Sequence, residues 1–208
     1  KCTYPADLAD LGDNPEAYKF TPPWNSEQRT YELKTNNTQD DYSAIRDLCH
    51  TVGTASDADF QCELEAIFDV DGFLRLAAVE ILVGHWDNYI GNQNNFYLYE
   101  RPSDGRLMMF SYDVDNTCGI EWGGNWVGQN VYDWDQWGTK PLYDRMMGVE
   151  QYRTRLGWYI RDLIDNGSFT GSAWLQHGNS LKTMLTTAAL EDVYRTYDYG
   201  FDDNAFLN

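Results

Sequence analysis

The chain has 208 residues, of which 42% are apolar and 15% aromatic, and its 33 acidic and 15 basic side chains give a net charge of −18. Such a composition indicates a folded protein, because a disordered acidic chain has few apolar groups to bury. The charge argues against nucleic acid or an anionic membrane as a partner, and no run of about 18 apolar residues is present to span a membrane.

The amino-terminal third predicts loops followed by two helices. Proline, glycine and asparagine interrupt residues 1–30 too often for a long element, so this part is expected to be loop. A short strand is predicted over Thr30–Lys34. The apolar spacing of Asp40–His50 and of Ser56–Phe68 then predicts two amphipathic helices.

The central third predicts a buried helix and a hairpin. Within the predicted helix over 71–84, residues 73–84 are apolar on all sides except for Arg75 and Glu80, which is typical of a helix at the centre of a domain. We expect an aspartate, Asp69 or Asp71, to cap its amino terminus. A polar loop over residues 85–92 follows. Strand-forming residues at 95–100 and 106–112 then flank a turn and predict an antiparallel hairpin.

The remainder predicts a long loop and further helices. Residues 119–140 are rich in Gly and Trp without a regular period, and a loop of that length is commonly functional. Residues 141–165 and 174–190 have helical spacing. No repeat is present, so we predict one helix-dominated α+β domain over residues 1–208.

Four cysteines, Cys2, Cys49, Cys62 and Cys118, lack the spacing of a zinc site. Cys49 and Cys62 end two predicted helices joined by a short loop, which favours them as a disulfide pair. Four reduced cysteines remain an equally good alternative. The composition favours a secreted or cell-surface protein. The first residue is Lys1, with no initiator Met and no signal-peptide pattern, so we expect a processed or truncated piece.

The polar residues around the predicted hairpin point to a phosphoryl-transfer site. Asp87 and Asn92 precede it, and Asp113 and Asp115 follow it, so a tight hairpin should bring them to one side. An Asp, an Asn five residues later, a hairpin and another Asp is the order found in the protein-kinase catalytic core. Carboxylate and amide oxygens suit Mg²⁺, and one carboxylate is left to orient a hydroxyl. Asx turns at Asp87, Asn88 and Asn92 are the alternative explanation of these polar residues.

Longer segments resemble one family, the CotH spore-coat kinases, which are atypical kinases of the secretory pathway. The resemblance lies in YPADLADLGDNPEAYKF, YELKTNN, DYSAIRDL, the run from SDADFQCELEAIFDVDGFLRLAAVEILV to GHWDNYIGNQNNFYLY, FSYDVDNTCG, PLYDRMMGVEQYRTRL and YDYGFDDNAFLN. It implies an atypical protein-kinase-like fold, ATP with Mg²⁺ or Mn²⁺ as cofactors, and a secreted or surface protein as substrate. It also implies that Asp87 is catalytic, that Asn92 and Asp113 bind the metal, and that Asp115 can share that role.

The same resemblance places residues 30–37 at the last strand of the small lobe and the hinge, with Glu32 and Lys34 near the adenine. The chain has no Gly-rich phosphate loop. It therefore resembles a carboxyl-terminal lobe with its hinge, and the small lobe would precede Lys1.

A non-catalytic member of that family is the alternative function. It would be a cell-surface or cell-wall-associated binding protein, a pseudokinase or an adhesin. Four tryptophans of the Gly- and Trp-rich loop can stack on sugar rings of a carbohydrate partner; they are Trp122, Trp126, Trp134 and Trp137. Packing of the loop onto the domain is the competing interpretation of these side chains.

Overall fold

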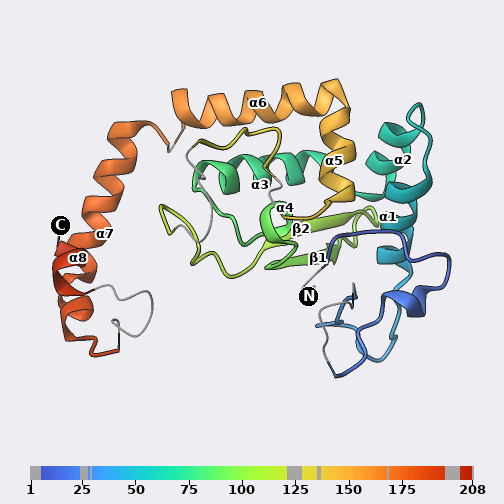
Figure 1. Cartoon of the computed structure of the whole chain (residues 1–208), viewed down its shortest axis with the longest axis horizontal. Helices are drawn as coiled ribbons and strands as arrows, with labels where there is room; N and C mark the ends of the chain where they lie inside the picture. The colour runs from blue at the N-terminus through green and yellow to red at the C-terminus, as the bar shows by residue number, and fades with distance from the viewer. Residues whose placement is uncertain are drawn as a thin grey trace. The chain divides into compact units, whose positions relative to one another are not determined.

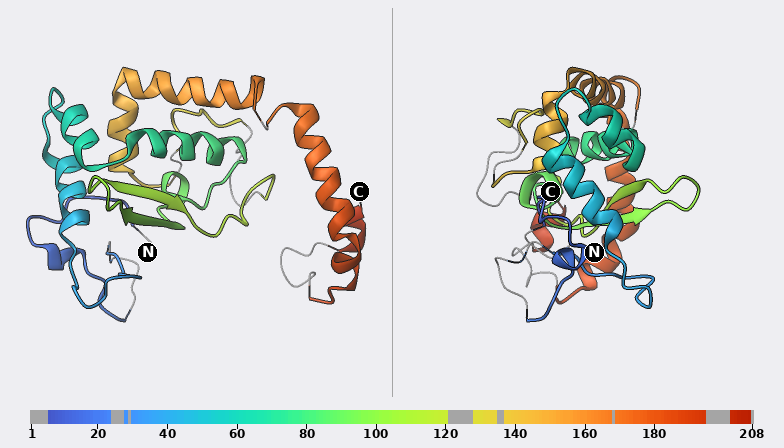
Figure 2. Two further views of the ribbon diagram at one scale, coloured as in Figure 1. Left: turned by 180° about the vertical axis from the view of Figure 1, so that it is seen from behind. Right: turned by 90° about the vertical axis from the view of Figure 1, so that its right-hand side faces the viewer.

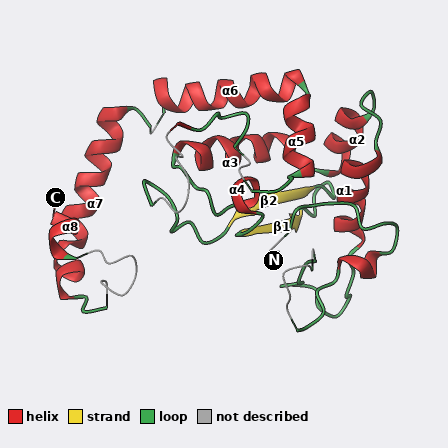
Figure 3. Cartoon of the chain, viewed as in Figure 1, coloured by secondary structure: helices red, strands yellow, loops and turns green. Residues whose placement is uncertain are grey.

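The computed structural model describes residues 6–23, 28, 30–120, 128–134, 137–167, 169–194 and 202–207. These residues form a helix-dominated α+β structure with one two-stranded antiparallel sheet (Figure 3). Two compact units are present, Lys1–Ile160 and Arg161–Asn208. The elements are η1 (Pro15–Tyr18), α1 (Ser43–Thr54), α2 (Phe60–Ile67), α3 (Val70–Leu82), α4 (Tyr89–Asn92), β1 (Phe96–Glu100), β2 (Leu107–Ser111), α5 (Pro141–Gly148), α6 (Glu150–Asp165), α7 (Gly171–Glu191) and α8 (Asp203–Leu207).

Helix α3 is the centre of the first unit. Asp69 caps it by accepting a hydrogen bond from the Gly72 amide at 3.2 Å, which confirms the expected cap. Figures 1 and 2 show α3 between α6 on one side and the β1–β2 hairpin on the other. On the α6 side, the Tyr159 hydroxyl donates to the Asp71 carboxylate. The helix buries one face, whereas Arg75 and Val79 on the opposite face are exposed, so the burial on all sides that its apolar sequence predicts is not found. The buried face consists of Val70, Phe73, Leu74, Ala77, Ala78 and Ile81.

The hairpin brings its two outer ends together. Phe96 pairs with Ser111 and Glu100 pairs with Leu107, which confirms the predicted antiparallel hairpin. The Tyr112 amide then donates to the Asn95 carbonyl at 2.8 Å, one step beyond the paired strands. The segments that precede β1 and follow β2 are therefore neighbours, which is the arrangement that the candidate site requires.

Arg145 of α5 joins the helices at the other end of the unit. Its guanidinium lies 4.0 Å from the centre of the Phe60 ring, at the start of α2. It also donates to the carbonyls of Val52 at 2.7 Å and Ala55 at 2.7 Å, at the end of α1. These carbonyls have no partner within their own helix, so the arginine stabilises the end of α1.

Two predicted elements differ from the structure. Residues 30–34 do not form a strand: Tyr31 makes a single isolated bridge with Lys19, because the chain leaves the pairing geometry after one residue. The predicted helix over 141–165 is divided at Val149, whose extended backbone separates α5 from α6.

The predicted Cys49–Cys62 disulfide is wrong. Both thiols are free, as is Cys118. Cys49 lies on the buried face of α1, where burial raises the pKa of its thiol, whereas Cys62 is exposed on α2. The two side chains therefore point to different environments. The exposure of Cys62 and Cys118 also excludes a core role for them, and Cys2 lies outside the described residues.

The second unit consists of the end of α6 together with α7 and α8. The side chain of Lys182 on α7 donates to the Leu207 carbonyl on α8 at 2.6 Å. The rings of Phe169 and Trp174 stack with their centres 4.9 Å apart at the start of α7. Within the described residues, no helix is long and apolar enough to cross a membrane.

Candidate active site

The loop after α3 is folded by local hydrogen bonds. Gly84 has a φ of +67°, which ends α3 and turns the chain toward His85. Asn88 caps the short helix α4 by accepting a hydrogen bond from the Gly91 amide at 2.7 Å. A Cβ on Gly91 would lie 1.9 Å from the Trp86 carbonyl oxygen, so this position requires glycine.

Asp87 is held in this loop by four side-chain amides. Its Oδ1 accepts from Asn92 at 2.8 Å and from Asn94 at 3.3 Å. Its Oδ2 accepts from Asn95 at 2.9 Å and from Asn116 at 3.3 Å. Each carboxylate oxygen thus has two donors, which fixes the orientation of the group. Because Asn116 follows the hairpin and the other three precede it, this carboxylate also joins the two segments.

The buried side chain of His85 lies close enough to the three predicted aspartates for their charges to affect its pKa. It is fully buried, and its Nδ1 lies 3.3 Å from the Asn116 carbonyl oxygen. Burial lowers the pKa of His85, and the hydrogen bond with Asn116 and the charges of Asp87, Asp115 and Asp113 oppose that effect. All three aspartates are therefore near enough to act on the same imidazole.

Asp113 and Asp115 differ from Asp87 in their surroundings. Both are exposed, and within the described residues neither carboxylate accepts a hydrogen bond. Asp113 has a φ of +51°, a conformation that Asp and Asn adopt more readily than most residues. In the described part of the chain, no three His, Cys, Asp or Glu side chains form a group that could hold a metal ion. The structure thus brings Asn92 into contact with Asp87 and leaves Asp113 and Asp115 at the solvent edge.

Sequence reasoning missed a buried network behind the loop. Glu80 of α3 is 7% exposed and accepts hydrogen bonds from Asn88 Nδ2 and from Ser111 Oγ, each at 2.7 Å. Burial raises the pKa of Glu80 to about 7, while the two hydrogen bonds act in the opposite direction. The available signal was a single carboxylate on an otherwise apolar helical run. The amides of Asn94, Asn95 and Asn116 were also missed, although the run GNQNN signals a polar cluster.

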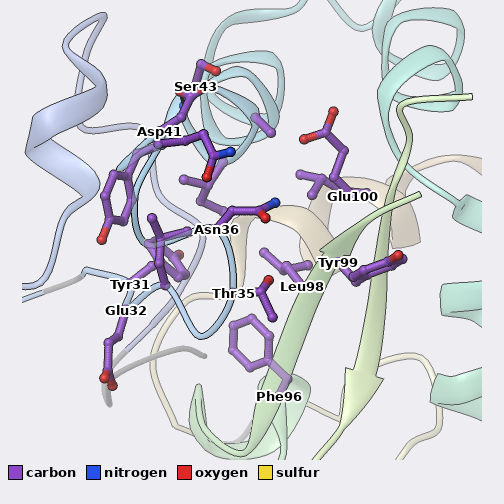
Figure 4. Close-up of a pocket in the computed structure, with 16 residues that line it drawn as sticks. Tyr31, Glu32, Thr35, Asn36, Asp41, Ser43, Phe96, Leu98, Tyr99 and Glu100 are labelled. Atoms are coloured by element: carbon purple, nitrogen blue, oxygen red, sulfur yellow. Dashed lines mark hydrogen bonds between the residues drawn. The ribbon is translucent and has the colours of Figure 1, made fainter. Parts of the chain in front are cut away.

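A cavity of about 290 Å³ lies between residues 31–45 and the hairpin. Figure 4 shows Asn36 and Thr35 on one side of it, facing Leu98 and Phe96 of β1. Asp87, Asn92, Asp113 and Asp115 are not among the residues that line this cavity, and Phe96, which follows Asn95 in sequence, is the link between the two. Its apolar lining comes mainly from Leu33, Ala44, Ile45, Phe96, Leu98 and Leu107, and its polar lining includes Asn36, Gln39, Asp41 and Ser43.

Of the two predicted hinge residues, only Glu32 is among the residues that line this cavity. Glu32 and Lys34 both line an adjoining cavity of about 490 Å³ beside Tyr97 and Phe110. Lys34 Nζ lies 2.7 Å from Glu32 Oε2, so the two side chains form an exposed ion pair. In Figure 4 the Glu32 carboxylate points away from Leu98, toward the outside of the cavity.

The tryptophans of the 119–140 segment pack against the loop where they are described. Trp134 is 2% exposed, and its indole N–H donates to the His85 carbonyl at 3.4 Å. The Trp137 ring meets the Trp86 ring edge-on at a centre-to-centre distance of 5.7 Å. Stacking of Trp134 on a sugar is therefore excluded by its burial, and packing explains both residues. Trp122 and Trp126 lie outside the described residues.

A family model described as "CotH kinase protein" matches residues 7–206. The chain belongs to the CotH family. Among curated CotH relatives, "Invasin CotH2" of Rhizopus delemar is 33% identical over 90 residues, which are 42% of this chain and 15% of that protein. "Inner spore coat protein H" of Bacillus subtilis is 29% identical over 89 residues, 43% of this chain and 24% of that protein.

A third CotH relative, "Invasin CotH3" of Rhizopus delemar, is 33% identical over 82 residues, 38% of this chain and 14% of that protein. The matched part is thus less than a quarter of each curated relative. No solved structure matches the chain.

Proposed function

We propose that this CotH-family chain is a protein kinase that transfers the γ-phosphoryl group of ATP to a Ser or Thr hydroxyl of a secreted or surface protein. The observation that carries the proposal is the fixed carboxylate of Asp87. Asp87 follows the helix α3 and precedes the hairpin, and it contacts Asn92. Asp113 and Asp115 follow the second strand of that hairpin. This is the order of residues that phosphoryl transfer to a hydroxyl uses, and the hairpin brings the two segments that carry them to one side.

The cavity beside β1 fits a nucleotide base. Its volume of about 290 Å³ suits a small ligand, and Leu33, Ile45 and Leu98 offer apolar surface for a planar ring. Asn36 and Gln39 offer amide groups for the ring's polar edge. Glu32 lines the edge of this cavity and Lys34 lines the adjoining one, so their ion pair would lie near the outer edge of a bound nucleotide.

Three side chains would hold the metal ion. The Nδ2 of Asn92 donates to Asp87, so its Oδ1 is the atom left for a cation. Asp113 and Asp115 offer carboxylate oxygens, which Mg²⁺ and Mn²⁺ prefer. When bound, ATP supplies the phosphoryl group and the metal ion offsets the negative charge of the phosphates.

Asp87 would hold the acceptor hydroxyl and take its proton. The hydrogen bonds from Asn94 and Asn116, at 3.3 Å each, are the longest that it accepts, so an incoming hydroxyl would replace one of them. The bonds from Asn92 and Asn95 would keep the carboxylate in place meanwhile. Proton transfer from a positioned hydroxyl typically contributes a factor of about 10² to 10⁴ in rate.

The relatives support a location outside the cell. One is named an inner spore coat protein and two are named invasins. The name invasin also favours a second candidate function, in which the chain binds a partner at a cell surface without turning over ATP.

Two variants test the kinase proposal and separate binding from chemistry. In calorimetric titrations with Mn²⁺ present, ATP should bind the wild-type chain and Asp87→Ala. It should not bind Leu98→Trp, whose indole fills the cavity. Transfer of label from γ-labelled ATP to the chain or to Ser/Thr peptides should occur in the wild type and in neither variant. Failure of the wild-type chain to bind ATP, together with binding to a glycan, would favour the second function.

A further inference from the structure

A single buried carboxylate lies behind the catalytic loop and contacts both segments of the site. Glu80 Oε2 accepts from Asn88 Nδ2 at 2.7 Å, and Glu80 Oε1 accepts from Ser111 Oγ at 2.7 Å. Neither bond involves Asp87, Asn92 or Asp113. The proposed chemistry therefore makes no direct use of this group.

The first hydrogen-bond partner of Glu80 is Asn88, which lies in the loop that carries Asp87. Asn88 directly follows Asp87, and its Oδ1 accepts from the Gly91 amide at 2.7 Å. Both ends of the Asn88 side chain are thus engaged, one by Glu80 and the other by α4. Fixing this amide fixes the backbone that carries Asp87 before it and Asn92 after it.

The second hydrogen-bond partner of Glu80 is Ser111, which lies at the end of the hairpin. Ser111 is the last residue of β2 and lies two residues before Asp113. Next to it, the Tyr112 amide donates to the Asn95 carbonyl at 2.8 Å. The Ser111 hydroxyl therefore anchors the point from which Asp113 and Asp115 extend.

We propose that Glu80 is a positioning residue that sets the separation between the loop carrying Asp87 and Asn92 and the segment carrying Asp113 and Asp115. This inference rests on the proposed kinase function, since it assigns Glu80 a role in that reaction. A rigid helix supplies the carboxylate, and its two oxygens hold two separate loops in a single geometry.

The burial of Glu80 supports a role beyond packing. An apolar side chain at this place in α3 would avoid the desolvation of a carboxyl group, which destabilises the fold unless the group is fully hydrogen-bonded. The neighbours of Glu80 on this helix are apolar on most sides, including Ala77 and Ile81. A carboxyl group at position 80 is therefore less favourable for stability than an apolar side chain, and what it adds is the two hydrogen bonds to Asn88 and Ser111.

Two substitutions distinguish hydrogen bonding from size. In Glu80→Gln, the amide oxygen can accept from Asn88 and the amide nitrogen can donate to the Ser111 hydroxyl, which is able to accept. Both connections are thereby kept. In Glu80→Met, the volume is similar but both connections are lost. Val52→Ala, in the buried face of α1, serves as a control that reduces stability without contact to either loop.

Amide hydrogen exchange measured residue by residue by NMR tests the positioning role without any assay of activity. Relative to slowly exchanging amides in α3, the amides of Gly91 and Tyr112 should exchange at least about tenfold faster in Glu80→Met. They should be unchanged in Glu80→Gln and Val52→Ala. Equal exchange of both amides in Glu80→Met and wild type would overturn the proposal. If Glu80→Met does not fold, Ser111→Ala takes its place. This variant should accelerate hydrogen exchange of the Tyr112 amide but not of the Gly91 amide, and unchanged exchange at Tyr112 would overturn the proposal.

Phosphoryl transfer provides the second measurement. Glu80→Met should lower kcat by about tenfold or more with the KM for ATP within about twofold, because misplaced catalytic groups reduce rate more than nucleotide binding. Glu80→Gln should restore kcat. An equal loss of kcat in Val52→Ala and Glu80→Met would show a merely structural role. A wild-type chain without transfer activity would refute the proposed function, whereas the exchange data would still decide whether Glu80 positions the two loops.

Discussion

Asp87 and the pair Asp113 and Asp115 act on the same buried imidazole of His85, but they differ in their fixation. Asp87 accepts four hydrogen bonds from amides, two on each oxygen. Asp113 and Asp115 are exposed and accept none within the described residues. The carboxylate of Asp87 is thus held in place by side chains of the protein, whereas the carboxylates of Asp113 and Asp115 are exposed to solvent.

The difference matches the roles proposed for the two regions. A group that orients a hydroxyl needs a fixed direction, which neutral amide donors provide without a competing charge. Groups that bind a cation need exposed oxygens whose charge is not already neutralised. We infer that a divalent ion would order the second region, while the first region is ordered in its absence.

The largest expected effect comes from removing the fixed carboxylate. Asp87→Ala should reduce phosphoryl transfer by about a hundredfold or more, because the acceptor hydroxyl loses its orienting group and its proton acceptor. Asp87 is only partly buried, so the fold should survive, as judged by circular dichroism. Asp47→Ala, on the exposed surface of α1, is the matched control. An unchanged rate of phosphoryl transfer in Asp87→Ala would show that the fixed carboxylate does not have the proposed role.

The next largest effect concerns the pH dependence of stability. Burial raises the pKa of Glu80 from 4.5 to about 7, so the folded state binds this proton more tightly than the unfolded state. The contribution of Glu80 to stability is therefore fully present below pH 4.5 and is lost as the pH rises through 7, by roughly 3 kcal/mol. Glu80→Gln should be more stable than wild type at pH 8 and nearly equal to it at pH 4.5. Urea unfolding at both pH values measures this, and a difference independent of pH would contradict it.

A backbone substitution tests how tightly the loop is packed. Gly91→Ala should lower the melting temperature by about 5 °C or more, because the new Cβ would overlap the Trp86 carbonyl oxygen and the loop must shift. Gly148→Ala is the matched control, since a Cβ there meets no atom within 4 Å. Similar melting temperatures for the two variants would show that the loop around Asp87 adapts easily.

The smallest effect concerns the exposed region and its metal ion. Millimolar Mg²⁺ or Mn²⁺ should raise the melting temperature by about 2–4 °C, which corresponds to about 1 kcal/mol for an ion at a few times its Kd. Asp113→Ala should lose most of this rise. Asp69→Ala should keep it, since Asp69 caps α3 and pairs with Arg101 instead.

The same titration assigns the roles of the two exposed aspartates. Loss of the rise in Asp115→Ala as well would show that both carboxylates bind the ion. An equal rise in wild type and Asp113→Ala would place the ion elsewhere in the protein.

Sequence periodicity was enough to predict the elements that carry the site. The apolar run over 71–84 predicted a central helix, and α3 occupies that position. Strand-forming residues on both sides of a turn predicted the hairpin, and β1 and β2 confirm it. The spacing of Asp87 and Asn92 predicted that they lie together, and a hydrogen bond of 2.8 Å joins them. These features depend on neighbours in sequence, which is why they can be read without coordinates.

The tertiary structure decided which polar groups meet across the chain. Asn116 reaches Asp87 over 29 positions, and Ser111 reaches Glu80 over 31, so no local pattern contains either contact. The strand predicted for 30–34 failed for the same reason, because a strand needs a partner along its length and Tyr31 meets Lys19 at a single point. The sequence by itself determined the central helix and the hairpin, and it predicted which polar residues lie around that hairpin. The packing of α3 against the hairpin, which the sequence does not show, brings Glu80 into contact with Asn88 and Ser111 and brings Asn116 to Asp87.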